Sequence, residues 1–199
     1  MLKRGMQANG ELPCLPPGYK LVPVRTTYLE MRRRPETEPV GSPSGCAVEH
    51  WKKPDTKAYR DLFSAVGSAW GWSGRLIMAD EECRAVIQAK TTEVHRLLCD
   101  GVTAGFVELD RSVPGQAEIA YFGLLPDFIG RGLGKFLLDR AVRLAWLGDT
   151  ERVWLHTCSY DHAGALAVYR RAGFSVYDER IEMQPYADEF LGRHRPTGG

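Results

Sequence analysis

The sequence lacks three features that point to particular partners: an excess of one charge, a long apolar run and an internal repeat. Its 26 lysine and arginine residues face 25 aspartate and glutamate residues, which gives a formal net charge of +1. This balance offers no electrostatic basis for binding nucleic acid or an acidic membrane. No apolar stretch approaches the ~18 residues of a membrane-spanning helix, and the first residues lack the apolar core of a secretory signal. We therefore expect a cytoplasmic protein with neither nucleic acid nor membrane as a partner.

Cysteine is sparse as well. Histidine and the carboxylates show no metal-ligand spacing, and the cysteines show neither the short spacing of a zinc site nor that of a redox motif. The sequence thus predicts reduced thiols and no metal. The five cysteines, an odd number, are Cys14, Cys46, Cys83, Cys99 and Cys158.

The residues that are present fit one mixed α/β domain. A chain of 199 residues, 44% hydrophobic and 26% charged, is long enough to bury one substantial core. Residues 1–18 are expected to form a lead-in, residues 19–183 the domain, and residues 184–199 a polar tail.

Hydrophobic spacing predicts a mixed sheet of six to seven strands and about four helices. Asp100-Gly101 is typical of a tight hairpin turn. Asp55 or Thr56 is a suitable N-cap for a helix that ends near Gly67. Strands are expected at residues 19–31, 93–99, 102–110, 117–125, 152–158, 174–177 and 180–183, and helices at 56–67, from 80 onward, at 133–147 and at 164–172.

The most informative stretch is residues 117–147, where an apolar strand leads through a glycine-rich turn into an amphipathic helix. Pro126 ends the strand because proline has no amide for a sheet ladder. Three glycines then alternate within residues 130–134. Such a turn directs free backbone amides and the positive end of a helix dipole at one point, which suits phosphate. A dinucleotide-binding fingerprint is excluded, because Lys135 stands where its third glycine belongs and no repeating strand-helix-strand unit surrounds it.

This stretch resembles the acetyl-CoA motif of the GNAT acetyltransferase family, Gln/Arg-x-x-Gly-x-Gly/Ala. The signature glycines are Gly132 and Gly134. Ile129 stands where Gln or Arg is usual, and Arg131 lies in the same turn. A second segment, residues 162–174, is similar to the family's Asn-x-x-Ala-x-x-x-Tyr-x-x-x-Gly-Phe.

In the second segment, His162 replaces the asparagine, and Tyr169 takes the position of the tyrosine proposed in the family to protonate the departing thiolate. The two motifs occur in the family's order with a strand between them, and the resemblance covers roughly residues 19–183. It implies a sheet whose two central strands splay apart, and acetyl-CoA as co-substrate. The residues that it implies for the cofactor are Phe122, Gly123, Leu124, Ile129, Gly130, Arg131, Gly132, Leu133, Gly134, Lys135 and His162.

For the acceptor, the resemblance implies that Glu118 is the general base, as in histone-type members, acting directly or through water. Glu108 on the neighbouring strand is the alternative base. Glu118 has an alternative interpretation as a carboxylate at a strand end that pairs with an arginine. Tyr169 has one as an aromatic side chain that packs on the core. His156 is expected to be a hydrogen-bonded core histidine. The residues expected to shape the acceptor pocket, unless the tryptophans only fill the core, are Tyr28, Trp70, Trp72, Arg75 and Tyr121.

The function expected is transfer of an acetyl group from acetyl-CoA to a primary amine, by direct attack in a ternary complex without a metal. The acceptor is a small molecule or a peptide, and the resemblance also implies a homodimer. The alternative is a non-catalytic acyl-CoA-binding or regulatory module on the same fold, since Ile129 and His162 both depart from the family motifs.

Overall fold

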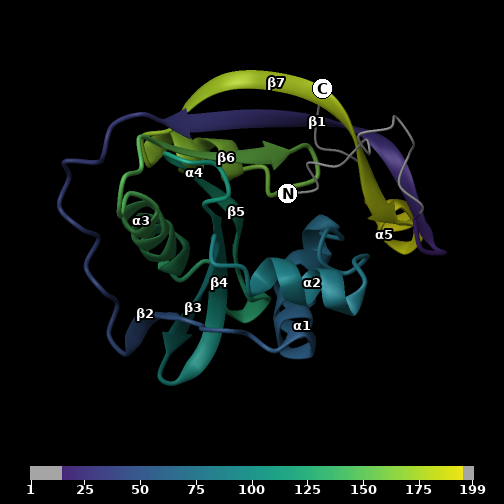
Figure 1. Cartoon of the computed structure of the whole chain (residues 1–199), viewed down its shortest axis with the longest axis horizontal. Helices are drawn as coiled ribbons and strands as arrows, with labels where there is room; N and C mark the ends of the chain where they lie inside the picture. Colours follow the sequence, from purple (N-terminus) through teal and green to yellow (C-terminus); the bar gives the residue numbers. More distant parts are fainter. Residues whose placement is uncertain (1–14, 195–199) are drawn as a thin grey trace.

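The computed structural model describes residues 15–194, so that Cys14 and most of the expected lead-in lie outside it (Figure 1). The strands of this part are β1 (Tyr19–Met31), β2 (Cys46–His50), β3 (Thr92–Cys99), β4 (Val102–Asp110), β5 (Gln116–Leu124), β6 (Arg152–Cys158) and β7 (Ser175–Ala187). The α-helices are α1 (Thr56–Gly67), α2 (Asp80–Ile87), α3 (Leu133–Ala145), α4 (Ala165–Arg171) and α5 (Asp188–Arg193). Two short 3-10 helices are η1 (Ser68–Trp70) and η2 (Pro126–Phe128).

The strands form one mixed sheet in the order β2-β3-β4-β5-β6-β1-β7. Neighbours run antiparallel except β5 and β6, which are parallel. Helix α3 covers one face of strands β3 to β5, while α1 and α2 cover the other (Figure 1). The predicted fold class, a single α/β domain with a mixed sheet of six to seven strands and about four helices, is confirmed.

The central strands separate soon after they pair. Strand β5 is in register with β6 from Gln116 to Glu118 only, opposite Arg152 to Trp154. Beyond this point β5 stays on β4, while β6 continues along β1. The result is the splayed pair that the resemblance implies, with a gap between the strands.

Local sequence signals explain several element boundaries. The Asp55 side chain accepts a hydrogen bond from the Ala58 amide at 3.0 Å and so caps α1. Asp100 and Gly101 have φ angles of 50° and 78°, the left-handed values of a type I′ hairpin turn. At the other end of the sheet, Arg111 donates to the carbonyls that end α3, which fixes that helix against the β4–β5 turn.

The prediction of reduced thiols is wrong for one pair. Cys46 and Cys99 form a disulfide between neighbouring strands, with their Cα atoms 4.0 Å apart. Strand β2, which the hydrophobic spacing does not predict, places Cys46 directly opposite Cys99. A pairing across 53 residues is set by the sheet and leaves no trace in local spacing. Cys83 and Cys158 are free thiols.

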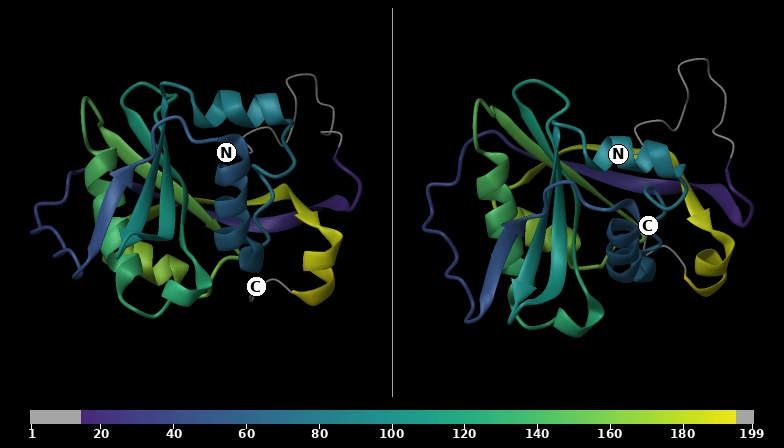
Figure 2. Two further views of the ribbon diagram at one scale, coloured as in Figure 1. Left: turned by 90° about the horizontal axis from the view of Figure 1, so that it is seen from below. Right: turned by 60° about the horizontal axis from the view of Figure 1, so that its bottom comes forward.

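The structure also differs from the expected polar tail. Strand β7 runs without interruption to Ala187, and α5 follows directly. Strand β1 pairs with β6 only from Thr26 onward, so that its first half and the end of β7 form a two-stranded ribbon beyond the sheet (Figure 2). Tyr186 and Phe190 bury their rings at the end of this ribbon and make a small separate core with Val24.

Within residues 15–194, no helix is long and apolar enough to cross a membrane, and no group of histidine, cysteine and carboxylate side chains is arranged to hold a metal.

Candidate active site

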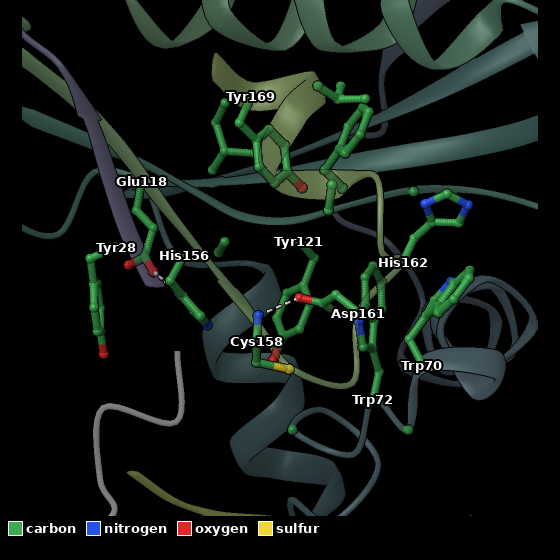
Figure 3. A pocket seen from close by; sticks show the side chains of 18 of the residues that line it. Tyr28, Trp70, Trp72, Glu118, Tyr121, His156, Cys158, Asp161, His162 and Tyr169 are labelled. Carbon is green, nitrogen blue, oxygen red and sulfur yellow. Dashed lines mark hydrogen bonds and ion pairs between the residues drawn. The ribbon is translucent and has the colours of Figure 1, made fainter. Parts of the chain in front are cut away.

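A cavity of about 1040 Å³ opens where β5 and β6 diverge. Its walls come from β5, β6, the start of α3, α4, the loop after η1, and β7 (Figure 3). Residues from both sequence motifs therefore border one space. The end of the ribbon closes it on one side, where the Ser73 hydroxyl donates to the Pro185 carbonyl at 2.5 Å.

The glycine-rich turn forms an open cradle at one end of the cavity. Gly130 and Gly132 have φ angles of +81° and +76°, which glycine adopts without strain, and an added Cβ at either would meet no atom within 4 Å. Gly132 is the N-cap of α3 and provides no side chain to satisfy the first amides of the helix. Free amides, a helix dipole and open space fit the pyrophosphate of coenzyme A.

The cofactor residues expected in this turn divide into two groups. Ile129 and Lys135 line the cavity together with the glycines. Arg131 instead lies with its guanidinium carbon 5.1 Å from the centre of the Phe128 ring, and Leu133 is buried in the main core. Neither side chain borders the cavity, so any contribution from these two positions comes through the backbone.

The end of β5 presents backbone groups to the gap. The Leu125 amide donates to the Ala104 carbonyl at 2.9 Å. Because hydrogen-bonded pairs alternate along an antiparallel ladder, the amides of Leu124 and Phe122 point away from β4, toward the missing neighbour. Phe122, Gly123 and Leu124 all line the cavity. This edge suits a peptide-like chain such as pantetheine.

Glu118 and Tyr169 both point into the cavity (Figure 3). The Glu118 side chain is 3% exposed, and its Oε1 lies 3.6 Å from Nδ1 of His156. The Tyr169 ring packs edge-on against Phe122, with 6.4 Å between ring centres. Burial, and secondarily the negative charge of Asp161, raise the pKa of the Tyr169 phenol above its usual 10.0. The phenol is therefore protonated at neutral pH.

Glu108 and Arg75 lie away from the cavity. Glu108 is fully buried, and its two carboxylate oxygens accept hydrogen bonds from Arg75 and Tyr59. The expectation that Arg75 lines the acceptor pocket is not met, because its side chain turns into the core beneath Tyr121, 5.2 Å from that ring. Both carboxylate oxygens of Glu108 are engaged, which leaves Glu118 as the carboxylate that faces the cavity from β5.

The other predicted acceptor residues line the cavity. Trp72 packs between the core and the cavity, with its ring centre 5.3 Å from that of Tyr121. Trp70 lies edge-on to His162, 5.5 Å between ring centres. The side chain of Tyr28, on β1, also lines the cavity. Burial, with a smaller contribution from the Glu108 charge, raises the pKa of Tyr121 to about 12.

Strand β6 forms a wall of the cavity that the sequence motifs do not predict. Trp154, His156 and Cys158 occupy alternate positions on this strand, and all three face the cavity. His156 is 31% exposed, so it is not the core histidine that was expected. Asp161 accepts hydrogen bonds from the Cys158 amide and the Thr157 hydroxyl, both at 2.8 Å. The period-two pattern of polar and aromatic side chains was the available signal.

Strand β7 supplies the second missed wall. The Tyr28 hydroxyl donates to Glu182 at 2.7 Å, and the guanidinium carbon of Arg180 lies 5.0 Å from the centre of the Tyr28 ring. Tyr177 packs on the same tyrosine, 6.0 Å between ring centres. The sequence predicts strands at residues 174–177 and 180–183 and a polar tail after them, and no motif in either part indicates that Tyr177, Arg180, Glu182 or Gln184 lines the site.

Comparison with known proteins agrees with this arrangement. The model of the acetyltransferase (GNAT) family matches residues 48–174. A mycothiol acetyltransferase from Clavibacter michiganensis subsp. michiganensis (strain NCPPB 382) is 30% identical over 168 residues, which cover 83% of this chain and 53% of that protein. One from Clavibacter sepedonicus is 32% identical over 145 residues, which cover 71% and 46%. The chain thus spans about half the length of the curated relatives it matches.

Solved structures share the fold at lower identity. A GCN5-related N-acetyltransferase from Sphaerobacter thermophilus superposes with a TM-score of 0.63 at 18% identity, covering 85% of this chain and 53% of that one. The ribosomal-protein-S18-alanine N-acetyltransferase from Escherichia coli gives a TM-score of 0.55 at 17% identity, covering 71% and 90%. The family model covers more than half of the sequence, and both of its motifs border one cavity. The chain therefore belongs to the acetyltransferase (GNAT) family.

Proposed function

We propose that the protein transfers an acetyl group from acetyl-CoA to a primary amine by direct attack within a ternary complex. The observation that carries this proposal is the single cavity shared by the glycine-rich turn, Glu118 and Tyr169. A donor that spans the turn and the edge of β5 brings its thioester between these two side chains. Family membership supports acetyl transfer as the type of reaction.

In the proposed mechanism, amides from Ile129 to Gly134 hold the pyrophosphate, with help from the dipole of α3 of about 0.3–1 kcal/mol. The outward-facing amides of Phe122 and Leu124 pair with pantetheine. The Leu124 amide is also the proposed donor to the oxyanion that develops at the thioester carbonyl. Removal of one such donor costs about 100-fold or more in rate in other enzymes.

Two side chains move protons in this mechanism. Glu118 takes a proton from the acceptor ammonium, which frees the lone pair for attack on the carbonyl carbon. As the carbon–sulfur bond breaks, the Tyr169 hydroxyl donates its proton to the thiolate, and the proton that the attacking nitrogen loses as the amide forms restores the phenol. The phenol carries its proton at neutral pH, so that this proton is available for the thiolate.

The acceptor is proposed to be a small-molecule or peptide amine held between the loop after η1 and β7. Aromatic side chains from both sides, among them Trp72 and Tyr28, favour an amine whose far end is apolar or cationic. The relatives are named mycothiol acetyltransferases, so the acceptor of such an enzyme belongs in any panel of test amines.

Release of free thiol from acetyl-CoA across a panel of amines tests the proposal. We expect turnover with at least one amine, and a fall in kcat of about 100-fold or more in Glu118→Gln and in Tyr169→Phe. Tight binding of acetyl-CoA without turnover on any amine contradicts the proposal and supports a non-catalytic acyl-CoA-binding module. Wild-type rates in both variants contradict the two assignments.

A cytoplasmic location and a homodimer remain proposals. The Cys46–Cys99 disulfide counts against the first, because glutathione keeps most cytosolic thiols reduced. Cell fractionation tests the location, and light scattering on the purified chain tests self-association.

A further inference from the structure

The cavity contains a histidine that the mechanism above does not use. His156 lies two residues beyond Trp154, where the pairing of β6 with β5 ends, and Glu118 is the last β5 residue of that pairing. The two side chains approach each other where the strands begin to separate, with Nδ1 of His156 3.6 Å from Oε1 of Glu118 (Figure 3). This places an imidazole directly beside the proposed base.

The two groups differ sharply in their access to solvent. The Glu118 side chain is 3% exposed and that of His156 is 31% exposed. Because the two nitrogens of an imidazole lie on different edges of the ring, Nε2 of His156 is turned away from Glu118. The distance of 3.6 Å exceeds a hydrogen bond, but catalytic hydrogen bonds are often long in the absence of substrate and tighten when it binds. The ring therefore connects a buried carboxylate with the open part of the cavity.

Other groups hold the ring in this orientation. Tyr28 lies opposite His156 in the β1–β6 register, with 5.7 Å between ring centres. The charged side chains of β7 in this region contact Tyr28 and not His156. Glu182 accepts a hydrogen bond from the Tyr28 hydroxyl, and Arg180 lies over the Tyr28 ring. Glu118 from β5 is thus the charged group that His156 contacts directly.

We propose that His156 is a positioning and proton-relay residue that acts through Glu118, an inference that rests on the proposed function. Glu118 takes a proton from the acceptor ammonium and passes it to Nδ1 of a neutral His156. The proton on Nε2 then leaves to water, and Glu118 is again a carboxylate. Proton exchange with water moves the remaining ring proton from Nδ1 back to Nε2 before the next cycle. One proton moves from the ammonium to solvent, which equals the single proton released when an ammonium and a thioester become an amide and a thiol.

The first test compares His156→Asn with the wild type. The asparagine amide can occupy the position of Nδ1 and still contact Glu118, but it cannot carry a proton. We expect kcat to fall about tenfold or more with an unchanged KM for acetyl-CoA. His50→Asn, on β2 and outside the cavity, is the matched control and should keep the wild-type kcat. Equal kcat values and pH profiles in His156→Asn and wild type overturn the relay.

Chemical rescue separates a relay from a structural role. Added imidazole should restore a measurable part of kcat in His156→Ala and leave the wild type unchanged. A loss of kcat that imidazole does not restore means that His156 only supports the wall, and it overturns the proposal.

A second readout does not depend on turnover, so that failure of the proposed function can be told apart from failure of the relay. The NMR signals of the His156 ring nitrogens should move in Glu118→Gln relative to the wild type, because Nδ1 of the ring lies beside the Glu118 carboxylate. Unchanged ring signals show that the two groups are uncoupled and overturn the relay, even if the enzyme is active. A wild type that shows the coupling but acetylates no amine contradicts the proposed function instead.

Discussion

Arg75 extends from the loop after η1 into the core and donates a hydrogen bond to Glu108, whose other oxygen accepts one from Tyr59. Both charged side chains are at most 3% exposed. The pair joins the loop that carries the cavity-lining Trp72 to the centre of β4. Its role is therefore to anchor an acceptor wall from behind rather than to contact the acceptor.

Removing one charge of this pair should be strongly destabilising. Arg75→Met leaves the Glu108 carboxylate buried without its counter-charge, and we expect the free energy of unfolding to fall by about 3–5 kcal/mol. Urea denaturation measures this. Adding Glu108→Leu to Arg75→Met should recover most of the loss. The matched control is Lys57→Met, which breaks the exposed Lys57–Asp61 pair and should change the free energy of unfolding little, because water screens the two charges. Similar losses for Arg75→Met and Lys57→Met contradict the anchoring role.

Gly132 offers a direct test of the proposed phosphate cradle. Gly132→Ala places a Cβ at a φ of +76°, which costs about 1–2 kcal/mol of stability, and puts that carbon in the open space at the start of α3. We expect KM for acetyl-CoA to rise at least about tenfold, since close approach of the pyrophosphate is blocked.

Gly148→Ala is a close control for this change. Gly148 has a φ of +71° and equally open surroundings, but it lies outside the cavity. Both alanine variants should lose similar stability, and only Gly132→Ala should lose affinity for acetyl-CoA. Equal KM values in the two variants indicate that the cofactor does not use this turn.

Ile129 is the residue of the turn that departs from the family motif. Its side chain is 49% exposed at the cavity edge, beside the positive end of α3. Ile129→Arg adds a cation near the proposed pyrophosphate site, and we expect KM for acetyl-CoA to fall several-fold at low ionic strength, with the gain lost in about 1 M salt. Ile181→Arg, an exposed position of β7 outside the cavity, is the control for a non-specific charge effect. If Ile181→Arg lowers KM for acetyl-CoA equally, the change comes from net charge and not from the position of the cation.

Features that depend on a few neighbouring residues were predictable, whereas those set by distant pairing were not. The Asp55 cap, the Asp100-Gly101 turn and the glycine cradle follow from local backbone chemistry, and the structure has all of them. Glu108 and Glu118 both sit on strands next to apolar residues, and only the assembled sheet shows that one faces the core and the other the cavity.

The C-terminal segment shows the same limit. Pro185 and the surrounding polar residues are typical of a tail, yet proline is tolerated in β7 because this is an edge strand with one free side. Its neighbour Tyr186 is buried through contact with Phe190 and Tyr160, which a sequence window cannot detect. The contribution of Gln184, Pro185 and Tyr186 to the cavity wall was missed for this reason.

The disulfide predicts a measurable dependence of stability on redox conditions. Cross-linking a 53-residue loop contributes up to about 4 kcal/mol by restricting the unfolded chain. A reductant should therefore lower the urea midpoint of the wild type and leave that of the Cys46→Ser/Cys99→Ser double variant unchanged. Thiol labelling under native conditions checks the assignment independently. Labelling of Cys46 and Cys99 without a reductant contradicts the cross-link.

The stability of the protein at acid pH should depend on Glu93. This residue lies at the start of β3, near the C-terminal end of α3 and away from the cavity. Its carboxylate accepts a hydrogen bond from Arg111 at 2.6 Å and contacts Nε2 of His95 at 3.2 Å. The His95 contact first, and then Arg111, lower the pKa of Glu93 from 4.5 to about 2. The folded protein thus binds this proton more weakly than the unfolded chain does. The resulting stability is fully present above pH 4.5 and is lost as the pH falls from there toward 2.

Glu93→Gln removes the carboxylate and with it this dependence. The variant should be less stable than the wild type at pH 7, and the two free energies of unfolding should converge as the pH approaches 2. Chemical denaturation at several pH values measures both.

Arg111 also donates to the Leu144 and Ala145 carbonyls, so part of the loss at pH 7 should appear as faster amide exchange at the end of α3. Glu81→Gln, at an exposed position of α2, is the control. Its free energy of unfolding should change with pH in the same way as that of the wild type. A constant offset between Glu93→Gln and wild type across this range means that the carboxylate stabilises the fold by packing and not by charge.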